Sequence, residues 1–405
     1  METLKLGVCA ALYLLLTGCA TTRQSQDDWA TRALDHSIQQ YTLLTQQIEP
    51  GIYPRSLDEH GQLVTAGSSS WISGFYPGTL WCLYEYQRAD SLKHTARRWT
   101  RELASQKHNT GTHDLGFIFS PSYGNAYRLL GEEADKEVLL TAARSLAQRF
   151  NPRVGCIKSW DFFNGPDKWE QYPVIIDNMM NLELLFEATR MSGDSTYHHM
   201  AVSHADHTLK NHVRADYSTY HVVDYDTLTG GVIKRITSQG FADESMWARG
   251  QAWSVAGFVI CYRYTQDEKY LQAASRLYDR YATHENLPAD GIPYWDFNDS
   301  AIPAVSRDAS AAAVMACYLQ ELARYSKEGA ARYQQQAENI LRTLSSEAYL
   351  VPAGGSHGFI LDHSTGHRPL NAEVDVPICY ADYYYVKALT DYLAHRNKPA
   401  LLTRK

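Results

Sequence analysis

One aspartate stands inside a stretch of the chain that is otherwise mostly apolar. Residues 172–189 read YPVIIDNMMNLELLFEAT, and Asp177 marks the start of a helical pattern in them. An aspartate in that place can cap the helix, because its side chain accepts a hydrogen bond from a free backbone amide. It can also act as an acid or a base if burial raises its pKa. The stretch by itself leaves both roles open.

Three further stretches place polar or aromatic side chains just before an apolar segment. They are WISGFYPG (71–78), HDLGF (113–117) and TSQGFADESMWARGQAW (237–253). The candidate site residues in them are Trp71, Phe75, His113, Asp114, Gln239, Trp247, Arg249 and Trp253. Carboxyl groups transfer protons, and aromatic faces support sugar rings. If these stretches meet Asp177 at one place, they form a site for acid–base chemistry on a sugar.

The elements around these stretches are helices of two kinds. Some segments are apolar nearly all round, and they cover residues 74–86, 177–190, 247–265 and 308–325. Others are amphipathic and charged, among them residues 91–106, 135–150 and 269–283. A helix that is apolar on every side must be buried among other helices, whereas an amphipathic helix covers it from outside. We therefore expect inner helices that alternate with outer ones.

The inner segments recur at a regular spacing. Their heads fall roughly 60–70 residues apart, which is typical of a repeat architecture; they lie near residues 114, 177, 249, 308 and 377. We expect about six helical pairs that form an all-α (α/α)6 toroid, a single catalytic domain over residues 31–396. The heads of the inner helices would then share one mouth. Strand signals are weak, and residues 221–234 are the candidate for a short hairpin.

The N-terminus resembles the signal peptide of a bacterial lipoprotein, over residues 1–18. Lys5 precedes an apolar run that is too short to span a bilayer, and the run ends in LTGC. We expect Cys19 to become the lipidated first residue, with a polar tether over residues 19–30; an ordinary cleaved signal is the alternative. The protein would then lie in the bacterial cell envelope, periplasmic or at the outer membrane, and touch a membrane through its lipid anchor only. Residues 397–405 read as a polar tail.

Composition limits the partners and cofactors. The net charge is −7 without a basic block, so nucleic acid is not an expected partner. The cysteines after Cys19 are odd in number and widely spaced, which predicts buried thiols. His204 and His207 share one face of an expected outer helix, but no cysteine converges on them. We therefore expect neither a metal site nor a cofactor.

Taken together, five motifs resemble glycoside hydrolase family 88, the unsaturated glucuronyl hydrolases. They are WISGFYPG (71–78), HDLGF (113–117), IIDNMMNLELLF (175–186), SQGFADESMWARGQAW (238–253) and DVPICYADYYYVKAL (375–389). The resemblance covers about residues 30–395 in order, and although each motif alone is modest, five in sequence are specific. More distantly, the chain is similar to the unsaturated rhamnogalacturonyl hydrolases, which share the six-hairpin toroid.

The resemblance implies an unusual route to glycoside cleavage. These enzymes remove the 4,5-unsaturated uronic acid that polysaccharide lyases leave at the non-reducing end of oligosaccharides, such as fragments of glycosaminoglycans or ulvan. A proton is added at C4 and water at C5 of the vinyl ether, and the glycosidic bond is then lost. Asp177 matches the general acid and base, and Asp114 matches its carboxylate neighbour. The separation rule for conventional two-carboxylate glycosidases does not transfer to this route.

The same resemblance implies roles for the other candidate residues. Two of them, His113 and Gln239, match positions that hydrogen-bond the unsaturated ring. The aromatic residues match those that stack on the two sugar rings, and core packing is the alternative for any one of them; they are Trp71, Phe75, Trp247 and Trp253.

Three positions leave alternatives open. Arg249 can bind the substrate carboxylate as a bidentate fork, or it can form an ion pair between helices. His363 aligns loosely with a histidine of a late loop in the family, and a surface histidine is the other interpretation. Tyr380 and Ala381 lie where family members vary around the second sugar, so the preference for sulfate stays open.

Two influences on Asp177 oppose one another. Burial among Met179, Met180 and Leu182, together with the like charge of Asp114, raises the pKa of Asp177. The head of a helix favours the anion and lowers that pKa. Because the acid must carry a proton, we expect a weakly acidic pH optimum.

Other classes of function remain as alternatives. One is an unsaturated rhamnogalacturonyl-type hydrolase, or another hydrolase or lyase on the same toroid, because a fold does not fix a function. Another is a non-catalytic lipoprotein that binds oligosaccharides. The binding lipoprotein is disfavoured, because a binding protein needs aromatic residues but has no use for two carboxylates in a cavity.

Overall fold

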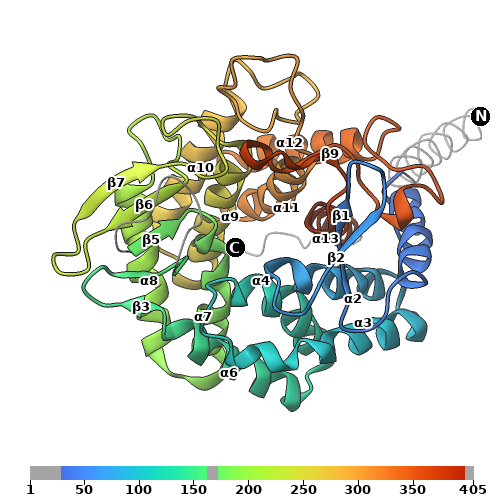
Figure 1. Ribbon diagram of the computed structural model, residues 1–405, viewed down its shortest axis with the longest axis horizontal. Helices are drawn as coiled ribbons and strands as arrows, with labels where there is room; N and C mark the ends of the chain where they lie inside the picture. The colour runs from blue at the N-terminus through green and yellow to red at the C-terminus, as the bar shows by residue number, and fades with distance from the viewer. Residues whose placement is uncertain (1–28, 162–171, 397–405) are drawn as a thin grey trace, which may run out of the picture.

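The inner helices lie in one ring, as the apolar segments predicted. The computed structural model describes residues 29–161 and 172–396. Its inner helices are α2 (Phe75–Gln87), α4 (Leu115–Phe119) with α5 (Asn125–Leu130), α7 (Asn178–Ser192), α9 (Ala248–Thr265), α11 (Ala309–Tyr325) and α13 (Cys379–Arg396). Each packs on the next, and α13 closes the ring against α2. Figure 1 looks along the axis of this ring.

The outer helices cover the ring from outside, one for each inner helix. They are a first helix over residues 29–45, α3 (Asp90–Glu102), α6 (Glu133–Ala147), α8 (Ser195–Asn211), α10 (Glu268–Ala282) and α12 (Ala330–Leu344). In α9 every side chain from Ala248 to Tyr262 is buried, whereas α10 buries only one face. This difference is the one expected between a helix enclosed by helices and a helix that covers them. The predicted (α/α)6 toroid is confirmed.

One inner element is not a continuous helix. Between α4 and α5 the chain forms a π-helical turn, η3 (Ser120–Gly124). Pro121 lies in this turn, and a proline has no amide hydrogen for the regular helical ladder. π-helix is rare in proteins, and it occurs mostly as such single turns inside α-helices.

Short antiparallel strands and turns lie between the helices in the chain. The strand pairs are β1 (Tyr53–Leu57) with β2 (Leu63–Ala66), β3 (Phe150–Asn151) with β4 (Cys156–Ile157), and β8 (Ser364–His367) with β9 (Ala372–Val376). Single turns of 3-10 helix are η1 (Trp71–Gly74), η2 (Ala104–His108), η4 (Ser356–Gly358) and η5 (Arg368–Leu370).

The hairpin predicted over residues 221–234 is present and belongs to a larger sheet. It consists of β6 (Val222–Tyr225) and β7 (Val232–Ile236). A third strand, β5 (Tyr172–Ile175), pairs with β6 and runs directly into Asp177. The sheet therefore fixes the approach of the chain to the aspartate.

The ends of the chain lie mostly outside the described residues. The predicted signal peptide, Cys19 and the predicted tail over residues 397–405 fall there. The last two residues of the predicted tether are described, and they already belong to the first helix. Trp29 packs on the ring of Tyr392 of α13, with ring centroids 5.3 Å apart, so the helical domain includes Trp29. Among the described residues, no helix has the length and apolar character that a membrane span requires.

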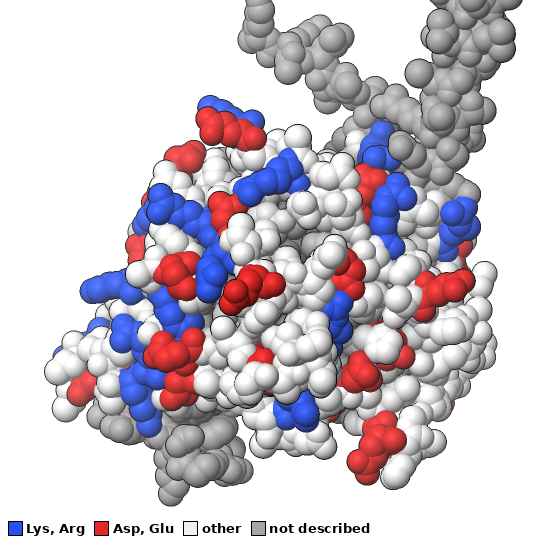
Figure 2. All heavy atoms as spheres, turned by 90° about the horizontal axis from the view of Figure 1, so that it is seen from above, with Lys and Arg blue, Asp and Glu red and all other residues white. Residues whose placement is uncertain are grey.

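Every cysteine in the described ranges is a free, buried thiol, as predicted. His204 is buried and accepts a hydrogen bond from the backbone amide of Ile157 at 3.0 Å, so it is less solvated than an outer helix suggested. Over residues 29–161 and 172–396, no group of three or more potential ligands forms a metal site. On the face in Figure 2, basic and acidic side chains are intermixed.

The contact between α4 and α7 generates a prediction about stability. A Cβ atom on Gly116 would lie 2.4 Å from the Cα atom of Asn181, whose side chain accepts a hydrogen bond from Phe117 N. Gly116→Ala should therefore lower the free energy of unfolding by about 1–3 kcal/mol, because the two backbones must separate. Urea unfolding measures the change. The matched control is Gly67→Ala, where a Cβ atom meets nothing within 4 Å. Equal stabilities of the two variants would contradict the prediction.

Candidate active site

The heads of the inner helices share one mouth, as predicted. A cavity of about 330 Å³ opens there. Its walls come from β1, η1, the start of α9, β8, β9 and the start of α13, and from the loops at Trp160 and Ser238. Of the predicted site residues, Trp71, Gln239 and Arg249 line this cavity.

Asp177 precedes α7, but its side chain does not cap the helix. Its carboxyl group makes no capping hydrogen bond. The side chain is 13 % exposed, and Oδ2 has no hydrogen-bond partner among the described residues. Burial raises the pKa of Asp177 from 3.8 to about 7; the charge of Arg249 opposes this shift, and the charge of Asp114 adds to it. The position at a helix head therefore serves to place a carboxyl group that is easily protonated.

Asp114 and His113 form a second polar pair beside Asp177. The side chain of Asp114 accepts a hydrogen bond from the Thr112 hydroxyl at 3.1 Å. His113 is buried, and its Nδ1 lies 2.8 Å from the backbone oxygen of Ser159, while its Nε2 lies 3.3 Å from Asp114 Oδ1. Because a backbone oxygen can only accept, Nδ1 carries the hydrogen, and in a neutral ring Nε2 can then only accept; it has no hydrogen-bond partner among the described residues. Burial lowers the pKa of His113, so it is neutral near pH 7.

His221 is a site residue that the sequence reasoning missed. Its Nδ1 accepts hydrogen bonds from the backbone amides of Ser238 and Gln239, at 3.0 and 3.1 Å. Nδ1 is therefore unprotonated, and in a neutral ring the hydrogen is on Nε2. Burial holds the pKa of His221 well below its usual range, which keeps the ring neutral. Nε2 lies 3.8 Å from Asp177 Oδ2, so His221 presents a donor to the unpaired oxygen.

The two carboxylates are not part of the cavity wall itself. His221 connects Asp177 with the wall, because the same imidazole faces Asp177 and holds the backbone of Gln239. The Gln239 side chain lines the cavity and donates to the backbone oxygen of Gly366 at 3.2 Å. Asp177 thus lies close to the cavity wall, and 13 % of its side chain is exposed.

The predicted aromatic residues separate into two groups. Trp71 lines the cavity, where its ring lies 5.0 Å from that of Tyr380. Trp247 is almost fully buried, with its ring 4.7 Å from that of His221. Phe75 and Trp253 are fully buried behind the cavity, in contact with Phe117 and Tyr384. The structure thus favours core packing for Phe75 and Trp253.

Arg249 forms an ion pair between helices, which was the alternative to a bidentate contact with the substrate carboxylate. It is buried, and its Nη1 donates to Asp308 Oδ2 at 2.8 Å. Its guanidinium also donates to the backbone oxygens of Thr365 and Gly366. Asp308 caps α11, so Arg249 joins the heads of α9 and α11 to β8. Arg249 lies on the cavity wall, but protein groups already hold both of its terminal nitrogens.

In the late loop the structure separates two histidines. His363 is 43 % exposed, pairs with Asp375 at 2.8 Å and does not line the cavity. This pair raises the pKa of His363, which is the behaviour of the surface histidine considered as the alternative. His367, four residues later in the same sequence LDHSTGHRP, lines the cavity instead. Tyr380 also lines it, whereas Ala381 is buried in the core.

Known proteins resemble this chain over most of its length. No family model matches the chain. An unsaturated glucuronyl hydrolase of Formosa agariphila is 47 % identical over 342 residues, which cover 83 % of this chain and 84 % of that protein. An unsaturated chondroitin disaccharide hydrolase of Streptococcus pneumoniae is 33 % identical over 343 residues, 82 % of this chain and 83 % of that protein.

Solved structures give the same result. A crystal structure of an unsaturated glucuronyl hydrolase specific for heparin has a TM-score of 0.89 and 43 % identity, and covers 92 % of this chain and 99 % of that chain. A variant of the enzyme from Streptococcus agalactiae, complexed with dGlcA-GalNAc6S, has a TM-score of 0.77 and 28 % identity, and covers 90 % of this chain and 91 % of that chain. The chain therefore belongs to the unsaturated glucuronyl hydrolases, which are glycoside hydrolases on an (α/α)6 toroid.

Proposed function

We propose that Asp177 is the general acid and base with which this hydrolase removes a 4,5-unsaturated uronic acid from the non-reducing end of an oligosaccharide. The observation that carries the proposal is the environment of Asp177. Its carboxyl group is buried, has an oxygen without a hydrogen-bond partner among the described residues, and has a pKa of about 7. A general acid–base group is most effective when its pKa lies near the working pH.

The first step adds water across the C4=C5 bond of the substrate. Asp177 gives its proton to C4, and the electron pair of the double bond forms the new C–H bond. The cation that develops at C5 is stabilised by the ring oxygen. Water then attacks C5 and returns a proton to the Asp177 carboxylate, so the catalyst is regenerated. One water molecule is consumed, and no oxidant or reductant is needed.

The product of hydration is a hemiketal at C5, and it falls apart by itself. The bond between C5 and the ring oxygen breaks, which leaves a ketone at C5 and a hydroxyl group at C1. C1 is now a hemiacetal that carries the oxygen of the second sugar. Its collapse gives an aldehyde and releases the second sugar as an alcohol. The protein must therefore stabilise only the first ring during the protonation step.

The pKa of Asp177 decides whether this chemistry runs at neutral pH. A free aspartic acid with a pKa near 3.9 is only about one part in a thousand protonated at pH 7. Burial of Asp177 raises its pKa to about 7, so about half of the molecules hold the proton. His221 offers Nε2–H to the carboxylate that remains after proton transfer, without being charged itself.

The cavity wall supports recognition of a sugar. Trp71 offers an aromatic face, and Gln239 offers an amide beside His221. Arg249 supplies positive charge on the wall while Asp308 fixes its position.

The substrate class follows from the relatives. Their names include hydrolases for unsaturated chondroitin disaccharide and an enzyme specific for heparin. We propose an unsaturated oligosaccharide from a glycosaminoglycan or a similar lyase product, such as one from ulvan, as the substrate of this chain. A panel of lyase-generated disaccharides with and without sulfate tests this proposal. Turnover of none of them would contradict it.

One assay separates this function from its alternatives. The unsaturated acid is conjugated and absorbs in the ultraviolet. Hydration removes that absorbance, a lyase acting on a polymer creates it, and a binding protein leaves it unchanged. The proposal requires loss of absorbance with lyase-generated disaccharides.

We also propose that the protein is an exported lipoprotein of the bacterial envelope, anchored through Cys19. The supporting observation is the sequence LTGC at the end of a short apolar run. Metabolic labelling with a fatty acid should mark the wild-type protein and not Cys19→Ser, and the variant should leave the membrane fraction. Equal labelling of both proteins would contradict the proposal.

The role of Asp177 predicts the effect of a conservative substitution. Asp177→Asn keeps the size of the side chain but cannot transfer the proton, so kcat should fall by about 10²–10⁴. Substrate binding should persist, because the cavity wall is unchanged. The loss of absorbance measures turnover, and equilibrium dialysis measures binding. A folded variant with near-normal kcat would rule out Asp177 as the acid.

The charge of Asp114 predicts a shift in the pH dependence. The free enzyme loses its acid as Asp177 ionises, so kcat/KM should fall as the pH rises through about 7. Asp114 raises the pKa of Asp177, so Asp114→Asn should move this fall to lower pH. A pH–rate profile of both proteins checks the direction. His363→Gln, at the exposed histidine, is the control that should leave the profile in place.

A further inference from the structure

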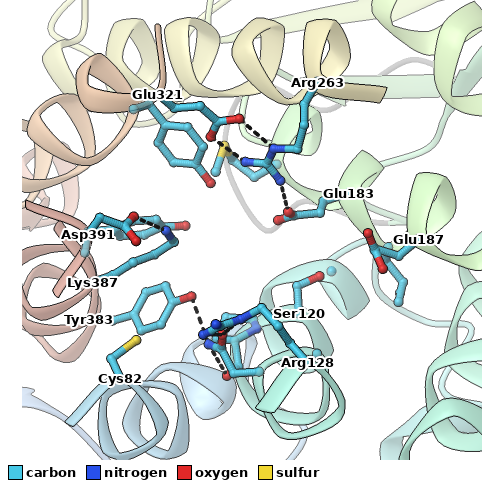
Figure 3. Close-up of a pocket in the computed structure, with 18 of the residues that line it drawn as sticks. Cys82, Ser120, Arg128, Glu183, Glu187, Arg263, Glu321, Tyr383, Lys387 and Asp391 are labelled. Atoms are coloured by element: carbon cyan, nitrogen blue, oxygen red, sulfur yellow. Dashed lines mark hydrogen bonds and ion pairs between the residues drawn. The ribbon is translucent and has the colours of Figure 1, made fainter. Parts of the chain in front are cut away.

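The toroid has a second cavity toward the other end of its inner helices. This cavity measures about 390 Å³, and Figure 3 gives a close-up of it. Its wall includes Glu183 of α7, Arg263 of α9, Glu321 of α11 and Lys387 of α13. Arg263 lies roughly 20 Å along α9 from Arg249 of the first cavity, because each helical residue adds about 1.5 Å. The second cavity is therefore a separate place in the fold.

A layer of aromatic side chains divides the two cavities. Phe117 lines the second cavity, and its ring lies 5.4 Å from that of Trp71, which lines the first. Trp253 packs beside it, with ring centroids 5.3 Å apart, and Tyr384 follows at 5.4 Å from Trp253. A ligand in the second cavity would therefore not touch Asp177.

Most charged groups of the second cavity are paired with one another. Arg263 bonds both Glu183 and Glu321, and its Nη2 lies 2.6 Å from Glu321 Oε2. Lys387 bonds Asp391 at 2.7 Å. Figure 3 shows these pairs around the hollow. A charged ligand would have to compete with them, whereas a neutral ligand can use the remaining lone pairs of the carboxylates.

Two tyrosine hydroxyls in this cavity have no partner. Tyr318 and Tyr384 line the cavity and are only 4 % and 3 % exposed. Among the described residues neither hydroxyl group makes a hydrogen bond, and neither oxygen is among the fully buried polar atoms without a partner, so both oxygens face the open space of the cavity. Each hydroxyl can donate one bond and accept another. Both hydroxyl groups can therefore bind a molecule that donates and accepts hydrogen bonds.

We propose that this second cavity binds a neutral, hydroxyl-rich small molecule, such as a monosaccharide or a polyol. The unpaired hydroxyls of Tyr318 and Tyr384 and the outer lone pairs of Glu183 and Glu321 supply its hydrogen bonds. The ring of Phe117 supplies an apolar face. The inner helices α7, α9 and α11 end toward this cavity, and the carbonyl ends of helices disfavour anions. The acidic substrate of the first cavity is thus a poor ligand for the second.

The experiment compares binding of neutral and acidic sugars to the whole folded protein. The probes are N-acetylglucosamine, glucose and xylitol as neutral molecules, and glucuronate as the acidic one. Saturation-transfer NMR titrations report binding to wild type, to Tyr318→Phe combined with Tyr384→Phe, and to Gln239→Ala. The phenylalanine changes keep the rings and remove only the hydroxyls, and thermal unfolding checks that each variant is folded.

The proposal expects at least one neutral probe to bind the wild type. Its affinity should fall about five- to tenfold in the double phenylalanine variant, the effect of losing hydrogen bonds. It should not change in Gln239→Ala, which alters only the first cavity. Three results overturn the proposal: no neutral probe binds, the double variant binds as well as wild type, or Gln239→Ala alone abolishes binding. If no neutral probe binds, the cavity holds only water.

Discussion

The structure depends on one unfavourable interaction, the removal of the Asp177 carboxyl group from water. An ionised carboxylate in that position is poorly compensated for the loss of water, because its Oδ2 has no hydrogen-bond partner among the described residues. The protein therefore favours the protonated form, and the pKa of Asp177 rises to about 7. Such strain persists only where the surrounding structure is rigid, and the toroid provides that rigidity by enclosing α7 between α4 and α9.

Two connections between distant parts of the chain hold the site in place. The pairing of β5 with β6 brings His221 beside Asp177, with Ile175 opposite Val222. The ion pair of Arg249 with Asp308 joins the heads of two inner helices, and both groups are buried. A buried pair stabilises little in itself, but losing one partner leaves an uncompensated charge, so the pair fixes this geometry. The site is thus built by contacts that the chemistry itself does not use.

The sequence predicted the helices and the mouth because their signals are local. Apolar positions all round 247–265 require an enclosed helix, and the heads of such helices must meet in a ring. Local signals do not determine contacts over long separations or the face of a helix on which a side chain lies. Phe75 and Trp253 stand in the right segments but point into the core. The cavity is lined by His367 and not by His363, and the sequence analysis did not identify His221. In both cases strand pairing decides which histidine reaches the site.

The most direct test is the stability of wild type and Asp177→Asn, measured by urea unfolding between pH 4 and pH 8. The folded pKa of Asp177, about 7, lies above the unfolded value of 3.8, so the folded state keeps a proton that the unfolded state releases. The wild type should therefore lose stability relative to the variant as the pH rises from about 4 to 7, by about 4 kcal/mol at most. Groups that do not interact with Asp177 cancel in this difference. A difference that does not change with pH would contradict a strained, protonated Asp177.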